Sequence, residues 1–233
     1  MRGPAIILFL LFSLATSVAS AGLIYTGSLS SETGGIQGSG VWVDVTLLRE
    51  KDYPNWVPAT LTWTVSENPD MSWRYQYELT VYRGDISHMI IETSLNFAFE
   101  DVLNCTENYQ VEWFPPGPST PGMPDNIYGV KFDGLTETTE TITFDSWRTP
   151  IWGNFYSKDG RAGGEQNAVW NTGFPDPGFD PYSEPSDGSL SYHILVPDTV
   201  LGPSEVIPEP ASIVLLLAGL SGLLLSTRNK RSG

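Results

Sequence analysis

Apolar and polar side chains alternate with a period of two residues from position 73 to position 81. The apolar positions are Trp73, Tyr75, Tyr77, Leu79 and Val81, and the polar positions between them are Arg74, Gln76, Glu78 and Thr80. Because successive side chains of a β-strand point to opposite faces of its sheet, this pattern predicts a strand with one buried face. A helix would require a period near 3.6 residues.

The same alternation recurs along the chain. Leu61, Trp63 and Val65 alternate with threonines, and the segment 41–48 alternates in the same way, which predicts two more strands. Segment 86–99 is apolar on both faces and predicts either one central strand or a pair of strands. Further strands are expected near 109–113, 127–132, 139–145, 151–157 and 190–196.

Glycine and proline separate these segments. Asp133-Gly134, Asp159-Gly160 and Asp187-Gly188 are dipeptides typical of hairpin turns or of loop starts. The proline-rich loop 114–125 is expected to bridge two halves of one fold. Many short strands separated in this way predict an all-β fold, a single antiparallel β-sandwich or jelly-roll-like domain over residues 22–200.

The N-terminal residues have the pattern of a secretory signal peptide. Arg2 precedes an apolar run, and small residues follow it. An A-x-A-type cleavage site formed by Ala19 and Ala21 predicts a signal peptide over residues 1–21 and a mature start at Gly22. Cleavage directly after Ala19 is the second option, and an uncleaved anchor is the third. In each case we expect the general secretion machinery to export the domain.

The last residues of the chain combine three features in a fixed order. After an expected linker over 201–207, the prolines of Pro208-Glu209-Pro210 lack backbone donors and end any preceding helix. Residues 211–226 are uncharged and mostly aliphatic, and as a helix they would reach about 24 Å, against a hydrocarbon core of about 30 Å. The basic tail over 228–231 consists of Arg228, Lys230 and Arg231. These cations favour a cytoplasmic end, and their snorkelling would help a short helix to span the membrane.

This order of motif, apolar helix and basic end resembles the PEP-CTERM sorting signal of Gram-negative bacteria. The resemblance covers residues 208–233, with Asn229 interrupting the basic tail. It implies that the chain is a substrate of an exosortase, a membrane transpeptidase-like enzyme, and that it is tied to exopolysaccharide and biofilm production. A processed signal and a permanent membrane anchor remain the two alternatives for this segment.

Acidic residues outnumber basic residues by 27 to 12, which gives a net charge of −15. Such a surface repels nucleic acid, so no nucleic-acid partner is expected, and it attracts divalent cations. The single cysteine, Cys105, excludes an internal disulfide. We expect Cys105 to be either a buried small hydrophobe or an intermolecular link.

The sequence carries no recognisable catalytic motif, and we expect no catalytic residue. It lacks a Gly-x-Ser-x-Gly elbow, a His-Glu-x-x-His helix and a phosphate-binding glycine loop. Glu100-Asp101 and the pair Glu137 and Glu140 have the residue types of glycoside hydrolysis, but close pairs arise by chance among 27 acidic residues. An unrecognised hydrolase is therefore the third hypothesis for function.

Two kinds of ligand are compatible with the sequence, calcium and glycan. Calcium binds six to eight oxygen ligands, and one irregular loop supplies the candidate ligands Asp176, Asp180, Glu184 and Asp187. A solvated acidic loop is the alternative. The chain also has eight tryptophans and ten tyrosines, whose exposed faces would stack on sugar rings unless they pack in the core. Tryptophans outside the clearest core faces are Trp42, Trp56, Trp147, Trp152 and Trp170.

Together these features predict an exported, non-enzymatic protein of the cell surface or extracellular matrix. It would be tethered to the inner membrane through its C-terminal helix until an exosortase-like enzyme acts at Pro208-Glu209-Pro210. Exopolysaccharide is the expected candidate partner. A permanently membrane-anchored module that binds glycan or calcium is the alternative.

Overall fold

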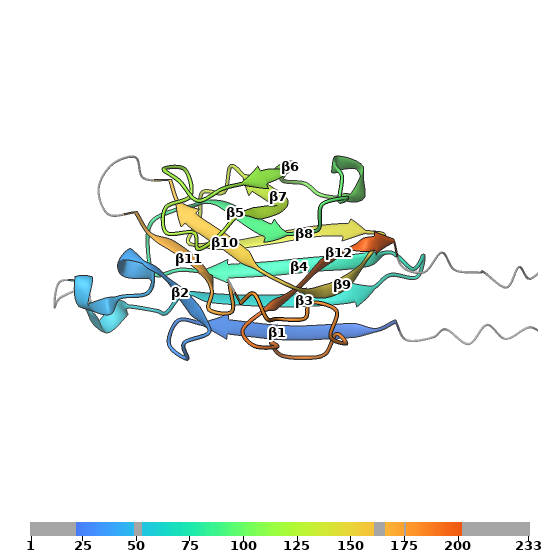
Figure 1. Ribbon diagram of the computed structural model, residues 1–233. Helices are drawn as coiled ribbons and strands as arrows, with labels where there is room; N and C mark the ends of the chain where they lie inside the picture. The colour runs from blue at the N-terminus through green and yellow to red at the C-terminus, as the bar shows by residue number, and fades with distance from the viewer. Residues whose placement is uncertain (1–21, 49–52, 161–165, 175, 202–233) are drawn as a thin grey trace, which may run out of the picture.

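The computed structural model describes residues 22–48, 53–160, 166–174 and 176–201, shown in Figure 1. The predicted signal peptide with Ala19 and Ala21 and the predicted sorting segment 208–233 lie outside the described residues. Within the part of the chain that the structure describes, no helix is long and apolar enough to cross a membrane.

The described residues form an all-β fold of antiparallel sheets, an arrangement compatible with a β-sandwich. The four-stranded sheet contains, in order, β1 (Ile24–Ser30), β3 (Thr60–Glu67), β4 (Trp73–Thr80) and β8 (Thr139–Ser146). The six-stranded sheet contains, in order, β2 (Ile36–Ser39), β11 (Ala168–Asn171), β10 (Phe155–Asp159), β5 (Ile86–Glu92), β7 (Ile127–Asp133) and β6 (Asn108–Phe114). A two-stranded ribbon pairs β9 (Arg148–Gly153) with β12 (Ile194–Leu201).

The main core lies between the two large sheets. Strand β4 buries Trp73, Tyr75, Tyr77 and Leu79 and leaves Arg74, Gln76 and Glu78 exposed, which confirms the predicted strand. Phe144 of β8 packs on Phe132 of β7, with 5.4 Å between ring centroids, and so joins one sheet to the other. The hydroxyl groups of the buried tyrosines donate to the ribbon, Tyr75 to the Arg148 carbonyl (2.6 Å) and Tyr77 to the Leu195 carbonyl (2.8 Å). Every polar atom of these two side chains is thus satisfied inside the core.

The predicted strand over 41–48 is wrong. This segment forms two 3-10 turns, η1 (Gly40–Trp42) and η2 (Val45–Leu47). Side chains satisfy its backbone donors locally, because Asn167 Oδ1 accepts from Val41 N (2.8 Å) and Asp44 Oδ1 accepts from Thr46 N (2.8 Å). Such local hydrogen bonds replace the ladder of a strand.

Other boundaries also differ from the predictions. Segment 86–99 is a single strand that ends at Glu92 and is followed by the 3-10 turn η4 (Phe99–Asp101). Segment 151–157 is divided between β9 and β10, which belong to different sheets. The proline-rich loop 114–125 does not bridge two halves of the fold, because it joins the neighbouring strands β6 and β7. A further 3-10 turn, η3, spans Tyr53–Asn55.

The outer face of the six-stranded sheet carries a second hydrophobic cluster. Its buried members are Ile90, Phe114, Met123, Ile127, Tyr156, Ala168 and Phe174. Met89 and Ile91 belong to the main core, so the alternation along β5 places Ile90 on the opposite, outer face. The proline-rich loop 114–125 contributes Met123 to this cluster, and the Tyr156 hydroxyl donates to its Pro121 carbonyl (2.9 Å). This loop therefore covers the middle of the outer face.

Candidate functional site

A cleft of about 610 Å³ opens where β5 and β9 end and β7 begins, near the loop that follows β11. A volume of this size is typical of ligand pockets, which run from about 300 to 1,000 Å³. The cleft collects residues from several separate stretches of the chain, among them Glu92–Leu95, Trp113, the group Asp125, Asn126 and Tyr128, Ile151–Asn154, and the group Phe174, Asp176, Pro177, Phe179, Pro181 and Tyr182. His193 and Val196 also line it.

Aromatic side chains form much of the cleft wall. Trp113 of β6 is 56% exposed, and Tyr182 is 62% exposed. The ring of Tyr128 meets Trp113 edge to face, with centroids 5.5 Å apart, and its hydroxyl donates to the Phe97 carbonyl (2.9 Å). Contact with a neighbouring ring and a fixed hydroxyl limits the motion of Tyr128. The Trp113 surface is consequently supported and yet open to a ligand.

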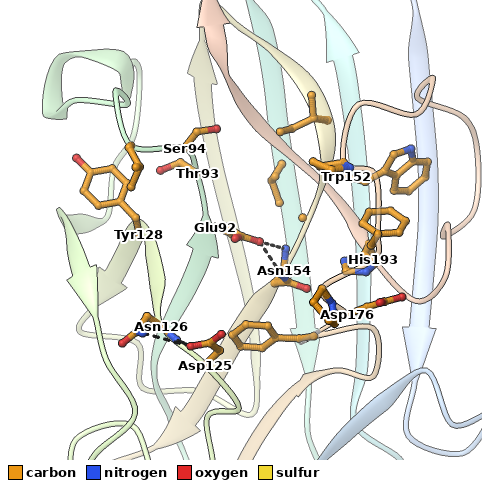
Figure 2. A pocket seen from close by; sticks show the side chains of 18 of the residues that line it. Glu92, Thr93, Ser94, Asp125, Asn126, Tyr128, Trp152, Asn154, Asp176 and His193 are labelled. Carbon is orange, nitrogen blue, oxygen red and sulfur yellow. Dashed lines mark hydrogen bonds between the residues drawn. The ribbon is translucent and has the colours of Figure 1, made fainter.

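The carboxylate of Glu92 lies in the middle of the lining residues in Figure 2. Its Oε2 accepts hydrogen bonds from the Asn154 backbone N (2.9 Å) and from Asn154 Nδ2 (2.6 Å). Asn154 Oδ1 in turn accepts from Asn171 Nδ2 (2.8 Å), and Asn171 Oδ1 accepts from Phe155 N (3.0 Å). This chain of hydrogen bonds fixes the orientation of the carboxylate at the end of β5.

Burial raises the pKa of the Glu92 carboxyl above its ordinary value, and the hydrogen bonds from Asn154 oppose that rise. The carboxylate of Asp125 also acts to raise this pKa. Glu92 is thus a well-positioned acceptor whose charge is only partly compensated. A ligand hydroxyl group that donates to it would improve its environment.

Other polar groups of the cleft are held in defined positions. Asp125 Oδ1 accepts from Asn126 N (2.7 Å) and from Asn126 Nδ2 (3.2 Å). The buried hydroxyl of Thr93 has no hydrogen-bond partner among the described residues. The imidazole of His193 stacks on Phe179 with centroids 3.7 Å apart, and burial lowers its pKa. The cleft therefore combines hydrogen-bonding groups with aromatic surface.

Two of the four carboxylates predicted as calcium ligands accept hydrogen bonds within their own loop. Asp176 Oδ1 accepts from Gly178 N (2.9 Å), and Asp180 Oδ1 accepts from Tyr182 N (3.0 Å). Asp187 Oδ1 accepts from the backbone N of Thr26 in β1 (2.8 Å), whereas the Glu184 carbonyl accepts from Trp152 Nε1 (3.4 Å). In the described ranges no group of three or more His, Cys, Asp or Glu side chains is arranged to hold a metal ion.

The tryptophans singled out from the sequence divide between the core and the surface. Trp42 and Trp152 are buried, and Trp56 and Trp170 are half-buried. Trp147 is 49% exposed but does not line the cleft. Trp113, which sequence analysis placed in a strand without a binding role, is the exposed tryptophan of the cleft. The sequence feature that could have indicated a binding role for Trp113 is its position near the end of a strand, next to the proline-rich loop.

The cysteine and the paired acidic residues singled out from the sequence have structural environments. Cys105 is half-buried against the main core, its Sγ lies 3.8 Å from the Glu107 carbonyl, and burial raises the pKa of its thiol. Asp101 pairs with the buried Arg148 (2.7 Å), and Glu140 accepts from the backbone N of Thr136 (2.7 Å) and of Glu137 (2.8 Å). These acids stabilise structure, and they do not line the cleft.

Comparisons of the chain with protein-family models, with curated proteins and with solved structures found no match.

Proposed function

We propose that this chain is an exported, non-enzymatic protein of the cell surface or extracellular matrix, and that its domain, a single jelly-roll-like sandwich, binds a polysaccharide in the cleft around Glu92. The observation that carries the proposal is that the exposed rings of Trp113 and Tyr182 line the same cleft as the fixed carboxylate of Glu92. Sugar rings present apolar C–H faces and hydroxyl edges, and this wall offers a matching surface to both.

The cleft would bind a sugar chain by stacking and by hydrogen bonding. A pyranose ring that covers Trp113 buries apolar surface from both partners. Its hydroxyl groups would donate to Glu92 and Asp125 and would accept from the Asn126 amide. A ligand without hydroxyl groups would add no donor to the Glu92 carboxylate beyond those of Asn154, so the site favours a polyhydroxylated ligand.

Retention of the full chain on exopolysaccharide from its host tests this part of the proposal. The full chain, purified in a mild nonionic detergent, is passed over the immobilised polymer and eluted with soluble polymer. We expect retention and no release of reducing sugar. Absence of retention on every polymer tested would contradict binding, and release of reducing sugar would replace binding by hydrolysis, with Glu92 as the first carboxylate to examine.

The second part of the proposal concerns sorting and rests on the sequence of residues 208–233. The general secretion machinery would export the chain, the helix 211–226 would hold it in the inner membrane, and an exosortase-like enzyme would act near Pro208-Glu209-Pro210. The prolines would keep that site extended, and the cations of the tail would orient the helix. The final location would be the cell surface or the matrix.

The intact mass of the mature protein from its native host tests the sorting proposal. We expect a chain that begins at Gly22 and ends near Pro210, with or without an attached glycan or lipid. A mass that still includes residues 211–233 would show a permanent anchor instead. That outcome would leave the binding proposal unaffected, because the cleft lies wholly within the described domain.

A further inference from the structure

A second, smaller pocket of about 270 Å³ lies at the other end of the outer face of β5. It is lined by His88, Phe114, Ser119, Thr120, Lys131 and Lys158, and we call it the His88 pocket. The alternation along β5 puts His88, Ile90 and Glu92 on one face, so the two pockets flank the second hydrophobic cluster. At about 3.4 Å per residue, His88 and Glu92 lie about 14 Å apart along the strand.

Strand register brings two lysines to the same face. Lys158 of β10 is the direct partner of His88, and Lys131 of β7 is the partner of Ile90. Directly opposed residues of antiparallel strands share a face, so both lysine side chains rise on the side of His88. The chain has only twelve lysines and arginines against 27 acids, and two of the twelve line this one pocket.

The two ammonium groups retain donors that the described residues do not use. Lys131 Nζ is paired with Asp133 Oδ1 (2.8 Å), and Lys158 Nζ donates to the Asp159 carbonyl (3.2 Å). An ammonium group has three donors, so each lysine can still donate toward the pocket. A cationic ligand would be repelled by this pair of charges, whereas an anion would be attracted.

His88 supplies an unsatisfied polar atom at the same place. The side chain is only 6% exposed, and its Nε2 is buried without a hydrogen-bond partner among the described residues. Its Nδ1 lies 3.2 Å from Ser87 Oγ, which can donate either to that nitrogen or to the Lys158 carbonyl (3.2 Å). When the Ser87 proton points to Nδ1, the imidazole carries its proton on Nε2 and needs an acceptor. A native structure rarely leaves such an atom without a partner.

We propose that the His88 pocket binds an oxyanion, a carboxylate, sulfate or phosphate group, through Lys131, Lys158 and the Nε2–H group of His88. The proposal does not depend on the cleft around Glu92, because no residue lines both pockets. The oxyanion has two candidate sources, a free inorganic anion and an acidic substituent on a polysaccharide.

Protonation of His88 would strengthen this binding. Burial, together with the charges of Lys131 and Lys158, lowers the pKa of His88 to about 4, while Asp133 acts in the opposite direction. Lys131 and Asp133 of β7 and Lys158 and Asp159 of β10 are the charged groups of the two neighbouring strands at this position. An anion bound between the lysines would offset their charge and raise the pKa of His88, so binding is expected to take up protons as the pH falls from 7 to 5.

Isothermal titration calorimetry on the full chain in nonionic detergent tests the proposal. The probes are sodium sulfate, sodium phosphate, sodium acetate and polygalacturonate, at constant ionic strength set with sodium chloride. We expect one site per chain, with affinity that increases from pH 7 to pH 5. Tighter binding of polygalacturonate than of acetate would identify the acidic polymer as the source, and the reverse order would identify the free anion.

Matched variants separate a built site from general charge attraction. Lys158→Gln removes a charged donor of the pocket and should weaken sulfate binding about tenfold or more. Arg83→Gln removes an equal charge from an exposed residue that does not line the pocket, and it should change the affinity less than twofold. Lys131→Gln is the second pocket variant if Lys158→Gln fails to fold. No heat with any probe, or equal loss in the pocket variant and in Arg83→Gln, would overturn the proposal.

Discussion

At the scale of single residues, Glu92 and His88 show how one strand can position two opposite kinds of polar group. Both lie on the outer face of β5, yet Glu92 accepts from Asn154 while His88 sits between two lysines. Burial shifts the pKa of each group toward its neutral form, upward for the carboxyl and downward for the imidazole. These opposite shifts lead to two different pH dependences of stability.

Glu92→Gln should stabilise the fold at neutral pH and weaken glycan binding. The pKa of Glu92 is raised in the folded state, so its contribution to stability is full below the unfolded pKa and is lost as the pH rises through the folded pKa. Glutamine imitates the neutral form, and the variant should therefore have a higher Tm than the wild type at pH 7 but an equal Tm at pH 4. Thermal unfolding at both pH values measures this. A variant that is less stable at pH 7 would contradict the account.

His88→Gln should remove part of the acid sensitivity of the fold. The pKa of His88 is lowered from 6.5 to about 4 on folding, so the unfolded chain binds the extra proton between these values. Stability is then full above about pH 6.5 and decreases as the pH falls toward 4, by about 2 kcal/mol between pH 7 and pH 4.5. Urea unfolding at these two pH values measures the free energy of unfolding. Between pH 7 and pH 4.5 this free energy should fall by that amount less in the variant than in the wild type. Equal losses of free energy in the two proteins would contradict the assignment of this acid sensitivity to His88.

At the scale of elements, the strands with strict alternation could be predicted from the sequence. In β4 each of Trp73, Tyr75 and Tyr77 is buried, and β3 follows the same pattern with Leu61, Trp63 and Val65. The three strands β1, β2 and β11 were not predicted, since they are short or contain small and polar residues such as Gly27 and Gly38. At Gly38, an added Cβ would lie 2.0 Å from the Ala168 carbonyl oxygen. The backbone of the neighbouring strand leaves no room for a side chain there, so this strand cannot show the full alternation of apolar and polar side chains.

The prediction of a strand over 41–48 is wrong because of a long-range contact that the sequence pattern does not reveal. Its alternation is genuine, but Asn167 lies more than one hundred residues away and satisfies Val41 N only once the chain has folded. The same limit applies to the cleft. Glu92 and Asn154 meet across a separation of 62 residues, and neither belongs to a motif. Trp113 could be assigned to a strand from sequence, whereas its exposure depends on how the sheets and loops end around it.

The proline-rich loop 114–125 should be held in place largely by Met123. This side chain is 4% exposed within the second hydrophobic cluster. Met123→Ala would leave a cavity there and should reduce the free energy of unfolding by about 2–3 kcal/mol. Met71→Ala is the matched control, because Met71 is 51% exposed and its loss should cost less than about 0.5 kcal/mol. Urea unfolding of both variants checks the difference, and equal costs would show that the loop is not anchored in this way.

At the scale of the whole molecule, acidic charge is spread along the chain while the two lysines of the His88 pocket lie together. The full chain has a net charge of −15, and such a charge repels other anionic surfaces. Two pockets of different chemistry then occupy opposite ends of the outer face of β5, one aromatic and acidic, the other basic. A long polymer with both neutral sugar rings and acidic substituents would fit both pockets. Ligand binding at each pocket can be tested without the other.

The affinity of the full chain for host exopolysaccharide, compared between Trp113→Ala and Trp147→Ala, tests the central claim most directly. Both tryptophans are about half exposed, but only Trp113 lines the cleft. A central aromatic contact typically contributes more than about 1.4 kcal/mol, so Trp113→Ala should raise the Kd about tenfold or more. Trp147→Ala should leave the Kd unchanged. An equal effect of the two substitutions, or no effect of Trp113→Ala on a polymer that the wild type binds, would contradict the assignment of the cleft as the glycan site.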